Sequence, residues 1–286
     1  MILVTRLLIY KLKRRIITYL NTLAKANASE SCEIRAIVEY LKKHRFSVFP
    51  YAFSEKYKAH TITVFFDGEF PYVLHDGKKL YGKRGWSKRK MQEYYNSLLL
   101  EQDEESPHCY LKDGHTPVQD SVIADIGAAE GIFSLDVMDY AQKIYLFECD
   151  ETWIEALEKT LAPYKDKVEI VRKYIGDNVS ESMTTLDTFF ADKRIDCIKA
   201  DIEGWEEAML LGGEKTFREK IRQAWLCLYH KQSAEKNITA SLRDFGFMHQ
   251  EINAGYMLFI WSESELGIPF EPPYIRHGVV YAEKQR

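Results

Sequence analysis

The sequence predicts an α/β protein with a mostly parallel sheet, preceded by an N-terminal α+β region. From Ser121 onward, short apolar runs alternate with amphipathic segments, which is the pattern of strand–helix–strand units. The first apolar run, Val122–Ile126, leads through a turn of small residues into a helix. The chain has 286 residues, of which 46% are hydrophobic and 29% charged, so a sizeable core can form.

Residues 1–115 are predicted to form an accessory region. Its expected elements are helices over 4–24 and 31–44, strands over Thr61–Asp67 and Tyr72–His75, and a helix over Lys88–Leu100. Ser87 is a suitable N-cap for that last helix. The acidic run at 101–108 is interpreted as a linker. We therefore place a division near residue 115, with a second domain over 116–286.

The second domain is expected to alternate regularly. The predicted strands are Val122–Ile126, Ile144–Phe147, Val168–Val171, Cys197–Ala200 and Ala224–Tyr229. The predicted helices are Ile132–Ala141, Trp153–Leu161, Glu206–Phe217 and Glu235–Phe245. After them, Phe247–Ile252 and Tyr256–Trp261 flank the turn residues Asn253-Ala-Gly255, which predicts an antiparallel hairpin.

The turn after the first strand predicts a cofactor site. Its order is Asp-x-Gly-x-Ala-x-Gly, from Asp125 through Gly127 and Ala129 to Gly131. Small residues in a strand–turn–helix unit let the backbone approach a nucleotide-like ligand closely. The next strand ends in Glu148. An acidic residue about 20 positions beyond such a loop can bind both hydroxyls of a ribose. A tight turn without a ligand is the alternative.

The loop favours one class of cofactor over another. A dinucleotide site needs Gly-x-Gly-x-x-Gly to admit a pyrophosphate, and that pattern is absent. The carboxylate of Asp125 would gain nothing beside an anion, but it would suit a cationic amino-acid tail. S-adenosylmethionine carries such a tail and a sulfonium. An NAD-dependent oxidoreductase is therefore disfavoured.

Four segments resemble the FkbM-type family of S-adenosylmethionine-dependent methyltransferases. They are Asp-Ile-Gly-Ala-Ala-Glu-Gly (125–131), Leu-Phe-Glu-Cys-Asp (146–150), Thr-Leu-Asp (185–187) and Ile-Lys-Ala-Asp-Ile-Glu-Gly (198–204). The resemblance implies a Rossmann-like class I methyltransferase sheet and methyl transfer, usually to a hydroxyl oxygen of a sugar or natural product. It also implies adenine contacts at Asp177. Family members often have Asn where this chain has Ala129, so contacts of that amide are absent here.

Three residues at predicted strand ends are candidates for the catalytic base. They are Asp201, Glu203 and His230, because ligands in open α/β sheets bind beyond the carboxyl ends of the strands. Structural alternatives stay open for each: a helix N-terminus complemented by the acids, or a histidine that merely ends a strand. Lys199 lies two residues before Asp201 and so shares its face, either near the ligand or in a buried ion pair. No metal is assigned, because the sequence has no three-residue metal signature.

Charge and cysteine usage restrict the partners. The formal net charge of −4 argues against nucleic acid, and the acceptor is expected to be a small molecule or glycan. The five cysteines are widely spaced, which indicates neither a disulfide framework nor zinc and fits a reducing cytoplasm. Residues 1–23 predict a basic amphipathic helix for a peripheral membrane contact, a second subunit or its own domain. A cofactor-binding protein without catalysis is the alternative function on the same fold.

Overall fold

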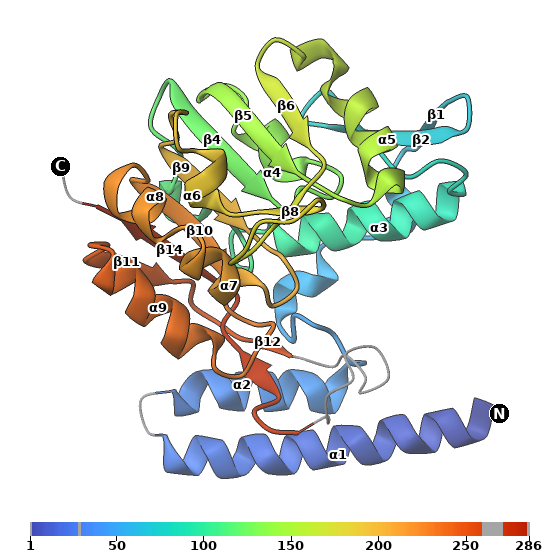
Figure 1. Cartoon of the computed structure of the whole chain (residues 1–286). Coiled ribbons are helices and arrows are strands. Elements are labelled where there is room, and N and C mark those ends of the chain that lie inside the picture. The colour runs from blue at the N-terminus through green and yellow to red at the C-terminus, as the bar shows by residue number, and fades with distance from the viewer. Residues whose placement is uncertain (1, 28–29, 259–270, 285–286) are drawn as a thin grey trace.

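The centre of the molecule is a seven-stranded sheet (Figure 1). In this computed structural model, residues 2–27, 30–258 and 271–284 are described, with only the backbone for 2–9 and 113. The strands are β4 (Ser121–Ile126), β5 (Ala141–Phe147), β6 (Val168–Val171), β9 (Cys197–Ala200), β10 (Gln223–Cys227), β11 (His249–Ile252) and β14 (Val279–Glu283). Their order is β11-β14-β10-β9-β4-β5-β6, and β14 alone runs antiparallel to its neighbours in this sheet. The mostly parallel Rossmann-like sheet is confirmed.

Two sets of helices cover the two faces of the sheet. One face carries α4 (Ile132–Asp136) and α5 (Glu151–Leu161); the other carries α6 (Leu186–Phe189), α7 (Glu206–Leu211), α8 (Glu214–Glu219) and α9 (Ala234–Asp244). Side chains alternate between the faces, as the pleat requires. Ile123 and Cys197 therefore enter one core, whereas Ala124 and Ile198 enter the other.

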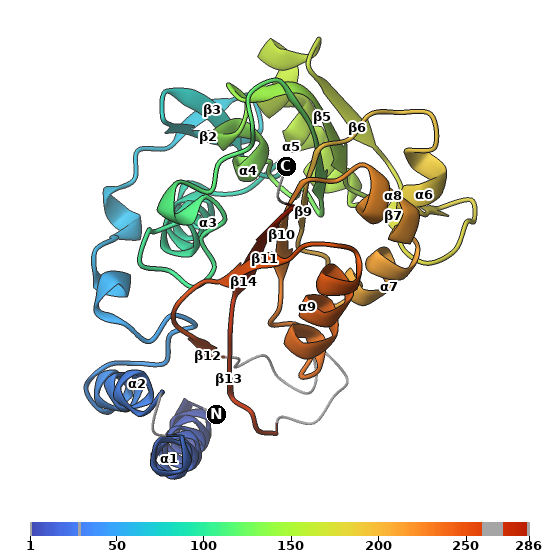
Figure 2. The same ribbon diagram turned by 90° about the vertical axis from the view of Figure 1, so that its left-hand side faces the viewer.

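The N-terminal region packs in two places. Its elements are α1 (Ile2–Ala26), α2 (Ser31–Lys43), the small sheet β1 (Phe65–Asp67), β2 (Phe70–His75) and β3 (Lys78–Tyr81), and α3 (Lys88–Glu101). Short 3-10 turns of this region lie at Ala52–Glu55, Ala59–Thr61 and Lys112–Gly114, and a further one follows α5 at Ala162–Tyr164. Val73, Leu80 and Met91 share one core with Ile123 of β4. α3 and the small sheet thus cover the face that carries α4 and α5, on the left of Figure 2.

The helical hairpin of α1 and α2 lies apart from that core. Its buried face packs on β12 (Met257–Leu258) and β13 (Ile275–Arg276), which form a two-stranded sheet. The predicted helix over 4–24 is thus present, although the side chains of Val4 and Leu8 lie outside the described residues. The division near residue 115 stays a prediction. In the described part of the chain, no helix combines the length and hydropathy needed to span a bilayer.

Several predicted elements differ from those observed. The prediction of a tight C-terminal hairpin is wrong, because β11 pairs with β14 and Met257–Leu258 pairs with Ile275–Arg276. Residues 259–261 of that hairpin lie outside the described residues. The predicted helix over Glu206–Phe217 is divided at Gly212 and Gly213 into α7 and α8. Gly212 packs against the backbone of Gly176, where a Cβ would lie 2.1 Å from the carbonyl oxygen. β3 was not expected at all.

The acidic run at 101–108 is not an exposed linker. Asp103, Ser106 and His108 are buried, and the Tyr57 hydroxyl donates a hydrogen bond of 2.6 Å to Asp103. The side chain of Asn253 donates to the carbonyl oxygens of residues 107 and 109. Charge alone suggested exposure, but tertiary partners satisfy these polar groups. The segment therefore forms one wall near the carboxyl edge of the sheet.

Candidate active site

A cavity of about 640 Å³ opens at the carboxyl ends of β4, β5 and β9. It is lined by Ile126, Gly127, Ala129, Phe147, Glu148, Cys149, Trp153, Lys173, Tyr174, Ile175, Met183, Asp201, Ile202, Glu203 and Trp205. Its size is within the usual range for small-molecule sites. Among the predicted site residues, Gly127, Ala129, Glu148, Asp201 and Glu203 contribute to the lining. Asp125, Gly131, Asp177 and His230 do not.

The loop after β4 is shaped by close backbone packing. Gly127 has φ of 74°, and a Cβ there would lie 2.1 Å from the carbonyl oxygen of Asp201. Ala129 has φ of 45°, and Gly131 has φ of 86° at the N-cap of α4. Left-handed backbone is costly for residues with a side chain. Gly127 is therefore required by the contact between the ends of β4 and β9, in addition to any ligand.

Glu148 is held rigidly at the end of β5. Its Oε2 accepts a hydrogen bond of 2.9 Å from the amide of Ala129, and its Oε1 accepts from the amides of Cys149 and Asp150. The carboxylate thus joins the glycine loop to the start of α5. Because the backbone fixes its orientation, Glu148 presents a pre-organised acceptor at the cavity wall.

Asp125 lies inside the sheet and away from the cavity. It is fully buried, accepts a hydrogen bond of 2.8 Å from the Ser134 hydroxyl, and lies 3.1 Å from Nζ of Lys199. Lys199 also donates to the carbonyl oxygen of Gly127 at 2.8 Å. Burial lowers the pKa of Lys199, but the carboxylates of Asp125 and Asp201 outweigh it and raise that pKa. The buried-ion-pair alternative for Lys199 therefore holds, and the expected contact of Asp125 with a cationic tail lacks geometric support.

Asp201 is the centre of a polar network at the end of β9. Its oxygens accept hydrogen bonds from the hydroxyls of Tyr110 at 2.8 Å and Tyr229 at 3.1 Å. His108 and His230 each place Nε2 3.4 Å from the carboxylate. Burial would raise the pKa of Asp201, but the hydrogen bond from His108 and the charges of both histidines hold it well below its usual range. Asp201 is thus a permanent carboxylate and a poor proton acceptor near neutral pH.

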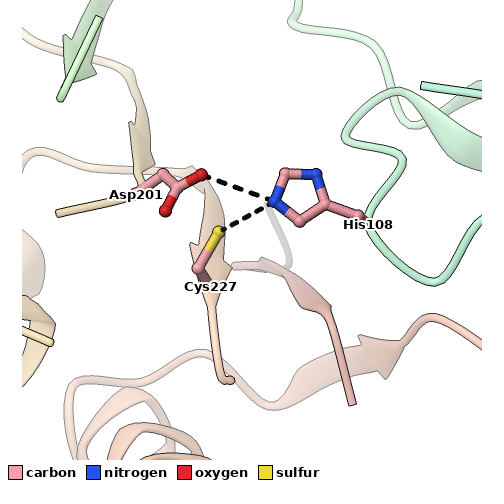
Figure 3. Close-up of side chains that lie close together, drawn as sticks. All are labelled: His108, Asp201 and Cys227. Atoms are coloured by element: carbon pink, nitrogen blue, oxygen red, sulfur yellow. Dashed lines mark hydrogen bonds and ion pairs between the residues drawn. The ribbon is translucent and has the colours of Figure 1, made fainter. Parts of the chain in front are cut away.

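His108 is a site residue that the sequence did not reveal. Figure 3 shows its imidazole pointing at Asp201 and Cys227 from a segment far away in sequence. The distance from Nε2 to the Cys227 sulfur is 3.9 Å. His108 lies in the run interpreted as a linker, where only the tertiary fold brings it to the sheet. A Pro-His-Cys sequence beside acidic residues was the one available signal.

The donor atoms of His108, Asp201 and Cys227 lie within 4.8 Å of one another, close enough for a metal ion. Two features disfavour that reading. Within the described part of the chain, His108 Nδ1 has no hydrogen-bond partner, whereas a metal-bound imidazole normally donates its second N–H to a neighbouring group. Burial also raises the pKa of the Cys227 thiol well above its ordinary value. We therefore assign no metal to this cluster.

His230 lies among three carboxylates. Its Nδ1 lies 3.0 Å from Glu206 at the start of α7, and its Nε2 lies 3.4 Å from Asp201 and 3.6 Å from Glu203. The Glu206 carboxylate is itself fixed by the amide of Ile202. Burial lowers the pKa of His230, but Glu206 and Asp201 outweigh it and raise that pKa above its usual value. Asp201, Glu203 and His230 are therefore brought together, as the strand ends predicted.

A second acid lies on the N-terminal side of the site. Glu101 ends α3, and burial raises the pKa of its carboxyl to about 7, with opposing effects from the charges of His108 and Glu130. On the same helix, the Tyr94 hydroxyl donates to Glu130. The sequence analysis did not select these residues, because one carboxylate in an acidic run cannot be told from its neighbours without the fold.

Asp177 is outside this arrangement. Its side chain is exposed, and its Oδ1 accepts a hydrogen bond of 3.0 Å from the Asn178 amide. The wall expected to hold an adenine is instead formed by apolar side chains, among them Trp153, Ile175 and Met183. The geometry of Asp177 therefore fits an ordinary turn residue better than a residue that contacts a cofactor.

One comparison supports the predicted family. The family model of the methyltransferase FkbM domain matches residues 170–258, a segment that contains Lys199, Asp201, Glu203 and His230. Residues 170–258 thus match an FkbM-type methyltransferase domain. The match bears out the predicted resemblance to that family and supports a methyltransferase, for which the family implies S-adenosylmethionine. The glycine loop and Glu148 lie before the matched segment.

Solved structures of other methyltransferases are similar at low identity. A methyltransferase FkbM from Methylobacillus flagellatus KT is 16% identical with a TM-score of 0.45, covering 94% of this chain and 59% of its own. A precorrin-6y C5,15-methyltransferase from Geobacter metallireducens is 15% identical with a TM-score of 0.39, and the match covers 58% of this chain and 82% of that chain. An rRNA methylase from Streptococcus thermophilus is 14% identical with a TM-score of 0.38, and the match covers 59% of this chain and 90% of that chain.

The chain thus spans about 59% of the length of the Methylobacillus flagellatus protein. No curated protein matches the sequence significantly. Because the TM-scores are all below 0.5, the fold assignment rests on the strand order of this chain itself.

Proposed function

We propose that the FkbM-type domain transfers the methyl group of S-adenosylmethionine to a hydroxyl oxygen of a sugar or natural product. The observation that carries this proposal is the composition of a single cavity. Its lining includes the loop residues Gly127 and Ala129 with Glu148 and, beside them, Asp201 and Glu203. A nucleoside-type ligand and a polar acceptor can therefore meet in one cavity.

The part of the cavity lined by Glu148 and Trp153 suits S-adenosylmethionine. Glu148 offers a fixed carboxylate to ribose hydroxyls, and Trp153, Ile175 and Met183 offer apolar walls to an adenine. A Cβ at Gly127 would collide with the end of β9, so the loop stays narrow there. When bound, this cofactor supplies an electrophilic methyl group on a sulfonium.

The part of the cavity lined by Asp201 and Glu203 suits a hydroxyl acceptor. Methyl transfer is an in-line displacement, so the protein must mainly align the acceptor oxygen and remove its proton. Asp201 can orient a hydroxyl as a permanent acceptor of hydrogen bonds, alongside the two tyrosine hydroxyls that it already binds. His230 is the base we favour, because Glu206 holds its Nδ1 and leaves Nε2 directed toward Asp201 and Glu203.

Two other functions are less well supported. The loop after β4 lacks the Gly-x-Gly-x-x-Gly that admits a pyrophosphate, and the carboxylates of Asp201 and Glu203 in the same cavity would repel one, so an NAD-dependent oxidoreductase is disfavoured. A cofactor-binding protein without catalysis would not need two histidines around a buried carboxylate.

Two measurements test the proposal. Calorimetry with S-adenosylmethionine, S-adenosylhomocysteine and NAD should give binding of both sulfur compounds and none of NAD. Incubation with methyl-labelled cofactor and fractionated glycan or metabolite extracts should then give label in a base-stable ether linkage. Binding of NAD alone would exclude the proposal. Label on nitrogen or carbon would retain the methyltransferase and exclude the oxygen acceptor.

A further inference from the structure

Charge is distributed very unevenly along this chain. Residues 1–46 carry ten lysines and arginines against three glutamates, a net charge of +7. The remaining 240 residues carry −11. α1 and α2 together account for most of the first segment, so the positive charge is concentrated on the helical hairpin.

The cations of the hairpin are exposed and mostly unpaired. Lys11, Arg14 and Lys25 of α1 are exposed, as are Arg35 and Lys43 of α2. Among the residues that the structure describes, none of these five has a carboxylate within ion-pair distance. Within the described ranges, these cations therefore lack the carboxylates that would normally neutralise a solvated helix face.

The apolar face of the hairpin is already occupied. Ile16 and Leu20 of α1 and Ile34 and Leu41 of α2 are fully buried in one cluster with residues of β12 and β13. Among the residues that the structure describes, the opposite face of α1 is exposed and basic, and it can receive another partner. Tyr10, at 57% exposed, adds an amphipathic ring under the guanidinium of Arg14.

The hairpin also forms one end of the molecule. α1 runs along the bottom of Figure 1 with α2 beside it, and Figure 2 shows both helices from their ends, below the rest of the chain. Two long helices side by side give an elongated, shallow surface. The remaining 240 residues carry a net negative charge and are repelled from an anionic plane, so the basic hairpin is the end favoured to approach one.

This end is connected directly to the acceptor side of the site. Ile275 of β13 packs in the hairpin cluster, and the next residue, Arg276, donates hydrogen bonds to the carbonyl oxygens of Tyr229 and His230. A surface that holds the hairpin would thus lie on the same side of the sheet as His230.

We propose that the α1–α2 hairpin docks this protein on the surface of an anionic lipid bilayer. Binding is electrostatic and peripheral, with Lys11, Arg14 and Lys25 as principal contacts, and it directs the carboxyl edge of the sheet toward the lipid. A cation close to an anionic membrane contributes roughly fivefold to the partition coefficient. Several together give measurable, salt-sensitive binding.

Nucleic acid and a second copy of the chain fit the surface less well. The exposed Tyr10 suits a lipid interface, and the net negative charge of the remaining 240 residues disfavours a nucleic acid. A second copy could place its acidic body against the hairpin, and this must be tested separately.

The decisive experiment is co-sedimentation of the full chain with lipid vesicles. Vesicles of phosphatidylcholine with phosphatidylglycerol should bind it at low salt, and vesicles of phosphatidylcholine alone should not. Raising the salt should release it. The triple variant Lys11→Gln/Arg14→Gln/Lys25→Gln should lose between tenfold and a hundredfold in partition coefficient.

A matched variant controls for the total charge. Lys88, Lys165 and Lys215 are exposed lysines away from the hairpin, and Lys88→Gln/Lys165→Gln/Lys215→Gln removes the same three charges. It should bind vesicles as the parent does. Equal losses in both variants, or no binding to anionic vesicles at low salt, would overturn the proposal. Two other results would also overturn it, in each case if the parent does not bind vesicles. One is light scattering that shows self-association of the parent and its loss in the hairpin variant. The other is a DNA or RNA titration that shows binding by the parent and its loss in the hairpin variant. None of these readouts depends on methyl transfer.

Discussion

Lys199 and Asp125 form an ion pair inside the sheet, with 3.1 Å between Nζ and Oδ1 and side chains 5% and 0% exposed. Removing one partner leaves a buried, uncompensated charge, which typically costs about 3–5 kcal/mol of stability. We therefore expect Lys199→Met to lower the free energy of unfolding by about that amount in urea titrations. The double variant Lys199→Met/Asp125→Leu should recover part of it. A single variant as stable as the parent would show that the pair is solvated.

Gly127 allows a different prediction about stability. Its Cβ would lie 2.1 Å from the Asp201 carbonyl oxygen, and its φ is 74°. Gly127→Ala should therefore destabilise the fold by about 3 kcal/mol or more, through overlap and strain together. Gly131→Ala would meet only the end of the Leu157 side chain, at 2.8 Å, and should cost less. Thermal unfolding of both variants checks the order, and equal losses would contradict it.

The close contact at Gly127 changes the interpretation of this residue. From the sequence alone, a glycine after a strand suggests space for a ligand, and a larger residue there would block binding but leave the fold intact. In the structure, the same glycine is required where the ends of β4 and β9 touch. A loss of cofactor binding in a Gly127 variant would thus report folding as much as ligand contact.

Local patterns predicted most of the sheet but not its C-terminal edge. Strands β4, β5, β6, β9 and β10 follow from apolar runs and turn residues, which are properties of neighbouring positions. The partner of β11 does not follow, because β14 lies some 30 residues further along the chain and pairing depends on the whole sheet. The turn at Asn253 suggested a hairpin, whereas its side chain holds the carbonyls of residues 107 and 109.

The same distinction between local patterns and long-range pairing applies to the residues of the site. Asp201, Glu203 and His230 could be selected because parallel strands end at one edge. Tyr110 and His108 could not, since they reach Asp201 from a segment about 90 residues earlier. Period-two alternation did place Lys199 and Asp201 on one face, and Asp125 lies on that face too. Alternation could not tell which of these charges pair with each other.

Glu148 should dominate cofactor affinity. Glu148→Ala is expected to weaken binding of S-adenosylhomocysteine by about 1–3 kcal/mol, because charge-assisted hydrogen bonds to the ribose are lost. The variant also loses the acceptor for the Ala129 amide, so Glu148→Gln separates the two effects by keeping an oxygen at that place. Glu151→Gln, on the exposed side of α5, is the matched control. Calorimetry giving the parent's affinity for both Glu148 variants would show that the ribose lies elsewhere.

His75 should make stability depend on pH. Its Nε2 lies 2.6 Å from Asp136 and its Nδ1 2.9 Å from the Tyr95 hydroxyl. Burial lowers the pKa of His75, but Asp136 outweighs it, so the folded pKa is raised above 6.5. The pair therefore stabilises fully below pH 6.5 and less as pH rises through the folded pKa.

Urea titrations from pH 5.5 to 9 of the parent and His75→Gln test this sign. The stability difference between them should be largest at the acid end and shrink toward the alkaline end. A difference that grows with pH would mean that His75 is neutral in the folded state. Asp136→Asn should abolish the same dependence, because it removes the carboxylate that holds the proton.

The last prediction identifies the base in the proposed reaction. If His230 accepts the acceptor's proton, turnover of the parent should fall as pH decreases through a midpoint above 6.5, because Glu206 and Asp201 raise the pKa of His230. His230→Gln should lower turnover by about a hundred- to ten-thousandfold and remove that limb of the profile. Glu206→Gln should instead move the midpoint to lower pH, since the carboxylate beside Nδ1 is lost. Cofactor affinity should stay within a few-fold in each variant.

Two further variants distinguish the competing groups. Asp201→Asn should reduce turnover through misalignment but keep an acid limb, because the pKa of Asp201 lies well below its usual range and cannot produce that limb. Glu101 has a pKa raised to about 7, so it could give a similar midpoint. Its removal by Glu101→Gln should leave the limb in place if His230 is the base. If the acid limb of the pH profile is lost in Glu101→Gln and persists in His230→Gln, the base is Glu101. A parent profile that is flat from pH 5.5 to 9 would exclude both groups and leave alignment alone to carry the reaction.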